Sequence, residues 1–110
     1  MRSGISDTMP IKVRRGLKKL GADIAVARKK RRLTVEMMLE RTSLSKQTYQ
    51  RIEKGDPSAS IGAYAMCLFA LGFNDPFSDI ADMKNDDTGL LLDRERLPKR
   101  VRIPKGEGAL

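Results

Sequence analysis

Five side chains that can donate hydrogen bonds share one stripe of a short predicted helix. At spacings of i, i+1, i+4, i+5 and i+8, they are Lys46, Gln47, Gln50, Arg51 and Lys54. The only acid in this segment, Glu53, lies off the stripe. Long donors on the exposed face of a helix are suited to binding base edges in the major groove of DNA. The alternative hypothesis is an ordinary solvated helix face, since charged faces are common.

The helix that carries this stripe is the second of two predicted between Leu33 and Gly55. Thr34 is a good N-cap for the first helix, whose predicted buried face is Val35, Met38, Leu39 and Thr42. Ser45 is predicted to cap the second helix, and Gly55 suits the position just after its C-terminus. The side chains expected to point inward from the second helix are Leu44, Ile52 and either Thr48 or Tyr49.

A long amphipathic helix is predicted before this pair, from Pro10 to about Arg32. Its predicted apolar seam consists of Val13, Leu17, Leu20, Ile24 and Ala27. Gly16 and Gly21 weaken this helix and are the positions at which it could bend or break.

Basic charge is concentrated on this long helix. Between Ile11 and Arg32 there are ten Lys or Arg residues against one acid, Asp23, while the whole chain has a net charge of +8. Such a surface fits an acidic partner, most simply nucleic acid, although plain solubility is the alternative. We predict phosphate contacts from Lys18 and Lys30. The predicted DNA-binding set is Thr34, Ser45, Lys46, Gln47, Gln50, Arg51, Lys54 and Lys30.

The segment from Ile61 to Phe73 carries no charge. A helix that is apolar all round is buried on more than one side, either as a central core helix or as a core helix that also contacts a second copy. For a homodimer, the predicted contact residues are Met66, Phe69 and Phe73. A short helix is then predicted from Asp75, which would close the core with Phe77, Ile80 and Ala81.

Several classes of protein are excluded by composition. Cys67 is the only cysteine and the chain has no His, which excludes an intrachain disulfide, a zinc finger and His-based catalysis. We expect no enzyme activity, catalytic residue, metal or cofactor. No apolar stretch approaches the ~20 residues of a membrane span, and no signal-peptide pattern is present, so a cytoplasmic, nucleoid-associated protein without membrane contact is expected.

The Leu33–Gly55 stretch resembles the helix-turn-helix of the XRE/Cro family of repressors. The matching residues are Leu33, Thr34, Glu36, Leu44, Ser45, Thr48 and the run Arg51–Gly55. The resemblance implies an all-α, five-helix lambda-repressor-like domain that binds double-stranded DNA, with an ion pair between Arg28 and Glu53. This sequence departs from the family pattern by having Val35 in place of Gln, Leu39 in place of a small residue and Ser43 in place of Gly.

A wider set of short motifs is similar to HipB-type antitoxins, which accompany HipA-type kinase toxins and repress their shared operon. These motifs include Leu20–Asp23, Glu53–Pro57, Leu68–Gly72 and Arg96–Arg102. The expected organisation is a flexible N-terminus at 1–8, a helix-turn-helix domain at 9–82, and a C-terminal arm and basic tail at 83–110. Two alternatives stay open: a stand-alone repressor without a toxin, and an adaptor for protein interaction that has lost DNA binding.

Overall fold

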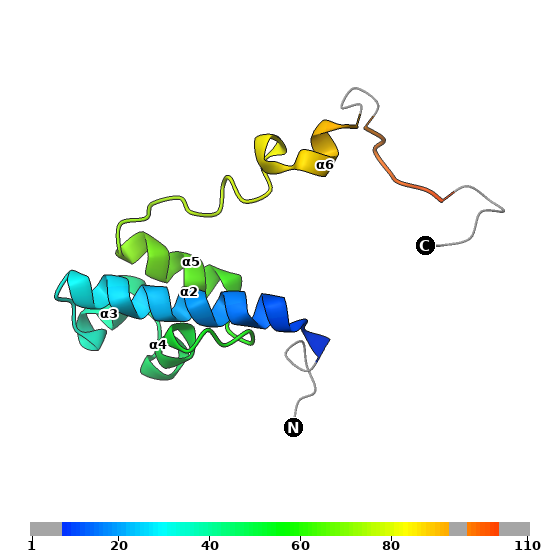
Figure 1. Ribbon diagram of the computed structural model, residues 1–110. Coiled ribbons are helices and arrows are strands. Elements are labelled where there is room, and N and C mark those ends of the chain that lie inside the picture. Colours follow the sequence, from blue (N-terminus) through cyan, green and yellow to red (C-terminus); the bar gives the residue numbers. More distant parts are fainter. Residues whose placement is uncertain (1–7, 93–96, 104–110) are drawn as a thin grey trace. The chain divides into compact units, whose positions relative to one another are not determined.

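The computed structural model describes residues 8–92 and 97–103, and these residues are helical or irregular, with no strand. The prediction of an all-α fold is therefore confirmed for this part of the chain. The chain divides into two compact units, Met1–Phe77 and Ser78–Leu110. The helices shown in Figure 1 are α2 (Ile11–Lys30), α3 (Val35–Thr42), α4 (Lys46–Glu53), α5 (Ile61–Ala70), the 3-10 helix η1 (Met83–Asn85) and α6 (Asp87–Leu90).

Helix α2 runs without a break through Gly16 and Gly21. Gly21 is buried where α2 meets the end of α4. A Cβ atom at this position would lie 2.6 Å from the Ile52 carbonyl oxygen and closer still to the Gly55 nitrogen. Gly21 therefore lowers the helix propensity of α2, but because it has no Cβ atom it lets the backbone of α2 contact the backbone at the end of α4.

The predicted helix caps are confirmed. Thr34 Oγ1 accepts a hydrogen bond of 3.1 Å from Met37 N, and Ser45 Oγ accepts one of 3.1 Å from Thr48 N. Ser60 caps α5 in the same way. Each cap satisfies one of the amide donors that a helix leaves unpaired in its first turn, so the bounds of α3, α4 and α5 follow from local chemistry.

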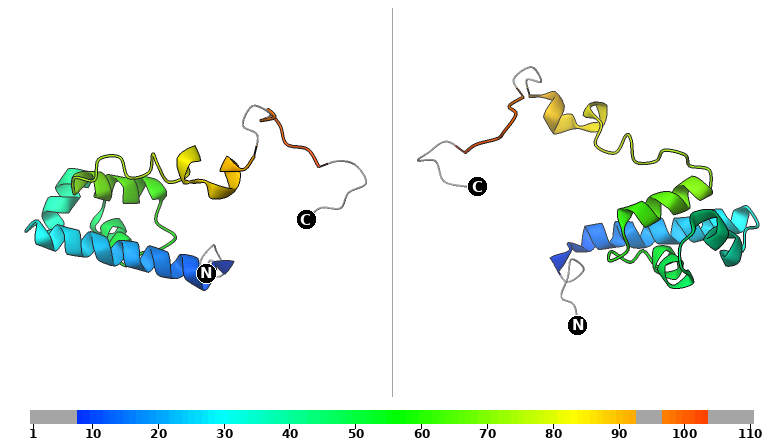
Figure 2. Two further views of the ribbon diagram at one scale, coloured as in Figure 1. Left: turned by 45° about the horizontal axis from the view of Figure 1, so that its top comes forward. Right: turned by 180° about the vertical axis from the view of Figure 1, so that it is seen from behind.

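The first unit has α2 along one side, with α3, α4 and α5 on the other side, as the views from the front and from behind show (Figures 1 and 2). Of the two alternatives Thr48 and Tyr49, it is Tyr49 that points into the core, where it is fully buried together with Ile52. Val13 is predicted to lie in the apolar seam but is 49% exposed, because the first turns of α2 extend beyond α4 and α5 (Figure 1). The core comprises Ile24, Met38, Tyr49, Ile52, Ala63, Tyr64, Cys67, Leu68 and Leu71.

The prediction of a short helix starting at Asp75 is wrong. Residues 76–81 form turns, and Ile80 and Ala81 are exposed instead of closing the core. Only Phe77 of the three predicted residues packs against the core. A helix of one or two turns is not stable without a packed face, and a single aromatic contact does not supply one. The described part of 9–82 thus contains four α-helices instead of the five predicted for the domain.

The second unit contains η1 and α6, which are capped by Asp82 and Asp86. The apolar run that begins at the last residue of α6 is exposed: Leu90, Leu91 and Leu92 show 56%, 87% and 68% of their surface. Residues 97–103 form neither helix nor strand. The predictions for residues 1–7, 93–96 and 104–110 lie outside the described residues. No described helix is both long and apolar enough to cross a bilayer.

Candidate functional site

The donor stripe of α4 faces outward. Its members are all exposed, whereas Tyr49 and Ile52 on the other side of the helix are fully buried. The two buried side chains anchor α4 to the core, and the stripe stays available to an external partner. The exposed members are Lys46, Gln47, Gln50, Arg51 and Lys54.

Thr34 and Ser45, which belong to the predicted site, lie at the N-termini of α3 and α4 and are exposed. Their hydroxyl oxygens accept hydrogen bonds from backbone amides, so their first role is to hold the ends of the two helices. The N-terminal turn of a helix presents amide groups and a partial positive charge, which favours an anion such as a phosphate group.

Helix α4 is fixed to α2 by an ion pair between Arg28 and Glu53. Arg28 Nε lies 2.7 Å from Glu53 Oε2, and the two side chains are only 12% and 18% exposed. Arg28 Nη2 also donates to Glu53 Oε1 at 3.4 Å. Arg28 Nη1 donates to the Leu33 carbonyl oxygen at 3.0 Å. One guanidinium therefore joins α2, the start of α3 and the end of α4.

Tyr49 completes this network, and it is not among the predicted site residues. Its hydroxyl donates a hydrogen bond to Glu53 Oε2. Burial raises the pKa of Tyr49, and the hydrogen bond to Glu53 raises it further. The pKa of Arg28 is also raised, chiefly by its hydrogen bond to Glu53. The spacing of Tyr49 and Glu53, four residues apart on one helix, is the sequence signal that marks this contact.

A second contact between α2 and α4 is made by backbone alone. Gly55 has a φ of +69°, and a Cβ atom on it would lie 2.6 Å from Lys18 Cα. Gly21 meets the same segment from the other helix. This contact and the ion pair lie at two places along α2, so α4 is held against rotation as well as translation. Sequence reasoning missed this role, although Gly21 lies seven residues before Arg28 and hence on the same face.

The basic residues of α2 do not form a single surface. Gly21 and Arg28 mark the side that meets α4, and Lys18 is exposed beside Gly55. Lys30 lies about 180° around α2 from Gly21, at 100° per residue. It lines a hollow with Asp23, Val26 and Phe73. The structure thus brings Lys18 near α4, but it does not bring Lys30 together with the α4 stripe.

The predicted dimer residues are exposed on the side of α5 that does not face the core. Met66 is 42% exposed and Phe69 is 59% exposed. Phe73 is 50% exposed and contacts the Arg31 guanidinium, 5.7 Å from its ring centroid. Since Ala63, Tyr64, Cys67 and Leu68 bury only one side of α5, the uncharged helix leaves an apolar surface that the first unit does not cover.

The residues that the structure describes contain no group of three or more His, Cys, Asp or Glu side chains arranged to hold a metal ion. Comparisons of the chain with protein-family models, curated proteins and solved structures find no match.

Proposed function

We propose that this protein is a sequence-specific DNA-binding transcriptional repressor in which α3 and α4 act as a helix-turn-helix. The observation that carries the proposal is the exposed donor stripe of α4, which contains no carboxylate and projects from a helix fixed at two points. Reading bases requires side chains held to a fraction of an ångström, and a rigid supporting contact supplies that precision.

Each member of the stripe has a role suited to its chemistry. The amide groups of Gln47 and Gln50 can bind adenine through two hydrogen bonds. Lys46 and Arg51 suit guanine or a phosphate, and Lys18 suits a phosphate of the backbone. Thr34 and Ser45 lie at helix N-termini, where a phosphate is favoured. We leave Lys30 out of the proposed interface, since the helical period puts it about 180° around α2 from Gly21, which meets the end of α4.

Selection of an operator from random duplexes, followed by titration monitored by fluorescence anisotropy, tests the proposal. Gln47→Ala is expected to weaken operator binding by about 1–3 kcal/mol and to relax preference at one base pair. Lys18→Ala is expected to weaken binding to all DNA sequences alike and to reduce the dependence of the affinity on salt concentration. Lys30→Ala is the matched control and should leave both quantities unchanged.

Two results would contradict the proposal. If selection yields no preferred sequence, the adaptor without DNA binding becomes the better hypothesis. If an operator is found but Gln47→Ala binds it as tightly as the parent, α4 does not read bases through this stripe.

We further propose that the protein acts as the antitoxin of a HipA-type kinase and represses its own operon. The support is the resemblance of its motifs to HipB-type antitoxins, together with exposed apolar side chains in the second unit, among them Leu90, Leu91, Leu97 and Val101. An exposed apolar segment of this kind is suited to ordering on a partner.

Co-expression with the product of the adjacent gene tests this second proposal, using the full chain and a chain ending at Met83. The full chain is expected to bind and neutralise the kinase, and the shortened chain is expected to lose that effect. Equal neutralisation by both chains would exclude residues 84–110 as the contact. If the neighbouring gene does not encode a kinase, the stand-alone repressor is the better hypothesis.

A further inference from the structure

A hollow lies between Phe73 and the outer side of α2, outside the proposed DNA interface. It is a hollow of about 280 Å³ that adjoins a second hollow of about 180 Å³, with Asp23 and Phe73 lining both. We refer to it as the α2–Phe73 surface, lined by Asp23, Val26, Ala27, Lys30, Arg31 and Phe73.

The α2–Phe73 surface combines an apolar floor with a basic rim. Val26 and Phe73, which both line this hollow, are 49% and 50% exposed. Lys30 and Arg31 stand at the edge, within the run of five cations at positions 28–32. The cation–π contact with Phe73 holds the Arg31 guanidinium at this edge.

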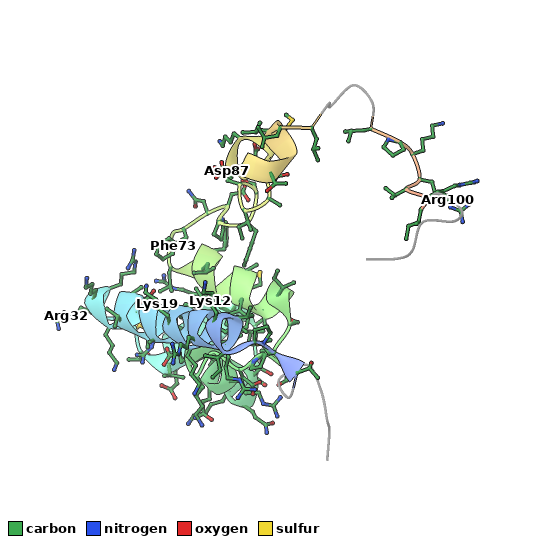
Figure 3. The ribbon with its side chains drawn as sticks, turned by 45° about the vertical axis from the view of Figure 1, so that its right-hand side comes forward. Lys12, Lys19, Arg32, Phe73, Asp87 and Arg100 are labelled. Atoms are coloured by element: carbon green, nitrogen blue, oxygen red, sulfur yellow. The ribbon has the colours of Figure 1, made fainter. Side chains whose placement is uncertain are left out.

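The one acid of this surface does not neutralise the rim. Asp23 is already paired with Lys19, whose Nζ lies 2.7 Å from Asp23 Oδ2. Neither Lys30 nor Arg31 forms an ion pair with a carboxylate of the described residues, and Arg31 Nη1 donates to the Ala27 carbonyl oxygen at 3.0 Å. Figure 3 shows Phe73 beside α2 and Arg32, the last cation of the run, at the C-terminal end of this helix.

We propose that the α2–Phe73 surface docks a protein segment that presents an apolar side chain flanked by carboxylates. An aliphatic or aromatic anchor would fill the hollow against Val26 and Phe73, and the carboxylates would pair with Lys30 and Arg31. Charge complementarity argues against a second copy of this chain, because a two-fold contact here would bring the basic rims of both copies together. The apolar floor argues against nucleic acid, whose backbone offers no matching group.

This inference goes beyond DNA binding and does not rest on it. Lys30 and Val26 lie on the side of α2 opposite to the residues that hold α4. A chain bound to DNA through α4 would still present this surface to a protein partner. The two interactions are therefore separable, and variants of one surface should leave the other interaction intact.

The test uses the full-length, isotope-labelled protein and short helical peptides observed by NMR and by fluorescence anisotropy. The probe peptide carries two leucines one helical turn apart, flanked by glutamates. One control peptide has lysine in place of each glutamate, and the other has alanine in place of each leucine. Binding of the probe alone is expected, with amide shifts confined to the residues that line the α2–Phe73 surface.

Variants then assign the contact. Lys30→Glu is expected to weaken binding of the probe peptide roughly threefold or more, since a charge that attracts the peptide becomes one that repels it. Phe73→Ala is expected to weaken it about tenfold by removing the aromatic floor. Lys12→Glu, an exposed cation on the same side of α2 but five turns away, is the control and should have no effect.

Three outcomes would overturn the inference. Equal binding of all three peptides would mean that the hollow lacks the proposed selectivity. Shifts that map to α4 would mean that the peptide only imitates a nucleic acid. A change in the monomer–dimer equilibrium of Lys30→Glu, seen by sedimentation, would assign this surface to a second copy of the chain.

Discussion

Glu53 accepts hydrogen bonds from two different helices at one carboxylate. Its Oε2 atom receives Arg28 Nε from α2 and the Tyr49 hydroxyl from its own helix. Removal of this carboxylate would leave a guanidinium and a phenol without their acceptor in a largely buried place. The cost of losing one member of such a network is the desolvation of the members that remain.

Glu53→Ala is accordingly expected to lower the free energy of unfolding by roughly 3–5 kcal/mol. Glu40→Ala, at an exposed position on α3, is the matched control and should change it by less than about 0.5 kcal/mol. Thermal and urea unfolding followed by circular dichroism would measure both. Equal melting temperatures for the two variants would show that the network adds little to stability.

Cys67 provides a second test at the scale of one residue. It is fully buried, and burial raises the pKa of its thiol from 9.0 to about 12. Because the folded state disfavours the thiolate, the contribution of this group to the free energy of unfolding is constant below pH 9. That contribution declines as the pH rises from 9 towards 12.

The thiol should therefore resist alkylation at pH 8 in the folded protein, since both access and ionisation are suppressed. We expect iodoacetamide labelling, followed by mass spectrometry, to proceed at the rate at which the core opens. Sub-denaturing urea should accelerate it, as should Glu53→Ala. Rapid labelling of the native protein, unaffected by urea, would mean that Cys67 is accessible.

At the scale of the helices, two glycines of α2 differ in what surrounds them. A Cβ atom on Gly16 would meet nothing within 4 Å, whereas one on Gly21 would collide with the backbone of residues 52, 53 and 55. The same substitution should thus have opposite effects at the two positions.

Gly16→Ala is expected to stabilise the protein by about 0.5–1 kcal/mol, through helix propensity alone. Gly21→Ala is expected to destabilise it by about 3 kcal/mol, because backbone atoms of α4 must move. In addition, Gly21→Ala should lose operator affinity at a temperature where it remains folded. Chemical unfolding and anisotropy titrations measure these effects, and a stabilising Gly21→Ala would contradict the close backbone contact.

At the scale of the whole molecule, the exposed apolar side of α5 leads us to propose a homodimer through Met66 and Phe69. A two-fold symmetric repressor can place two reading helices on successive major grooves of one operator. Phe73 is better assigned to the α2–Phe73 surface, because Arg31 holds it there.

Sedimentation at micromolar concentration is expected to show a dimer for the parent chain and a monomer for Phe69→Glu. Leu91→Glu is the control, since it places the same charge at an exposed apolar position of the other unit. The monomeric variant should also lose cooperative binding to a two-fold operator. A parent chain that sediments only as a monomer would refute the dimer.

The sequence alone determined the elements that depend on neighbours along the chain. An N-cap is a side-chain oxygen that accepts a hydrogen bond from an amide two or three residues later, and Thr34, Ser45 and Ser60 supply one at the starts of α3, α4 and α5. The helical period likewise places Lys46, Gln47 and Gln50 on one exposed stripe of α4.

Only the tertiary structure decided which side of each helix is covered and by what. Gly16 and Gly21 are equivalent by propensity, and α4 alone distinguishes them by contacting one and not the other. On charge alone, Lys30 is predicted to be a DNA contact. In the structure, α4 packs on the opposite side of α2 from Lys30. Ile80 fits an apolar pattern, yet the backbone around it forms turns and leaves it exposed. Each depends on contacts between segments distant in sequence, which local periodicity does not encode.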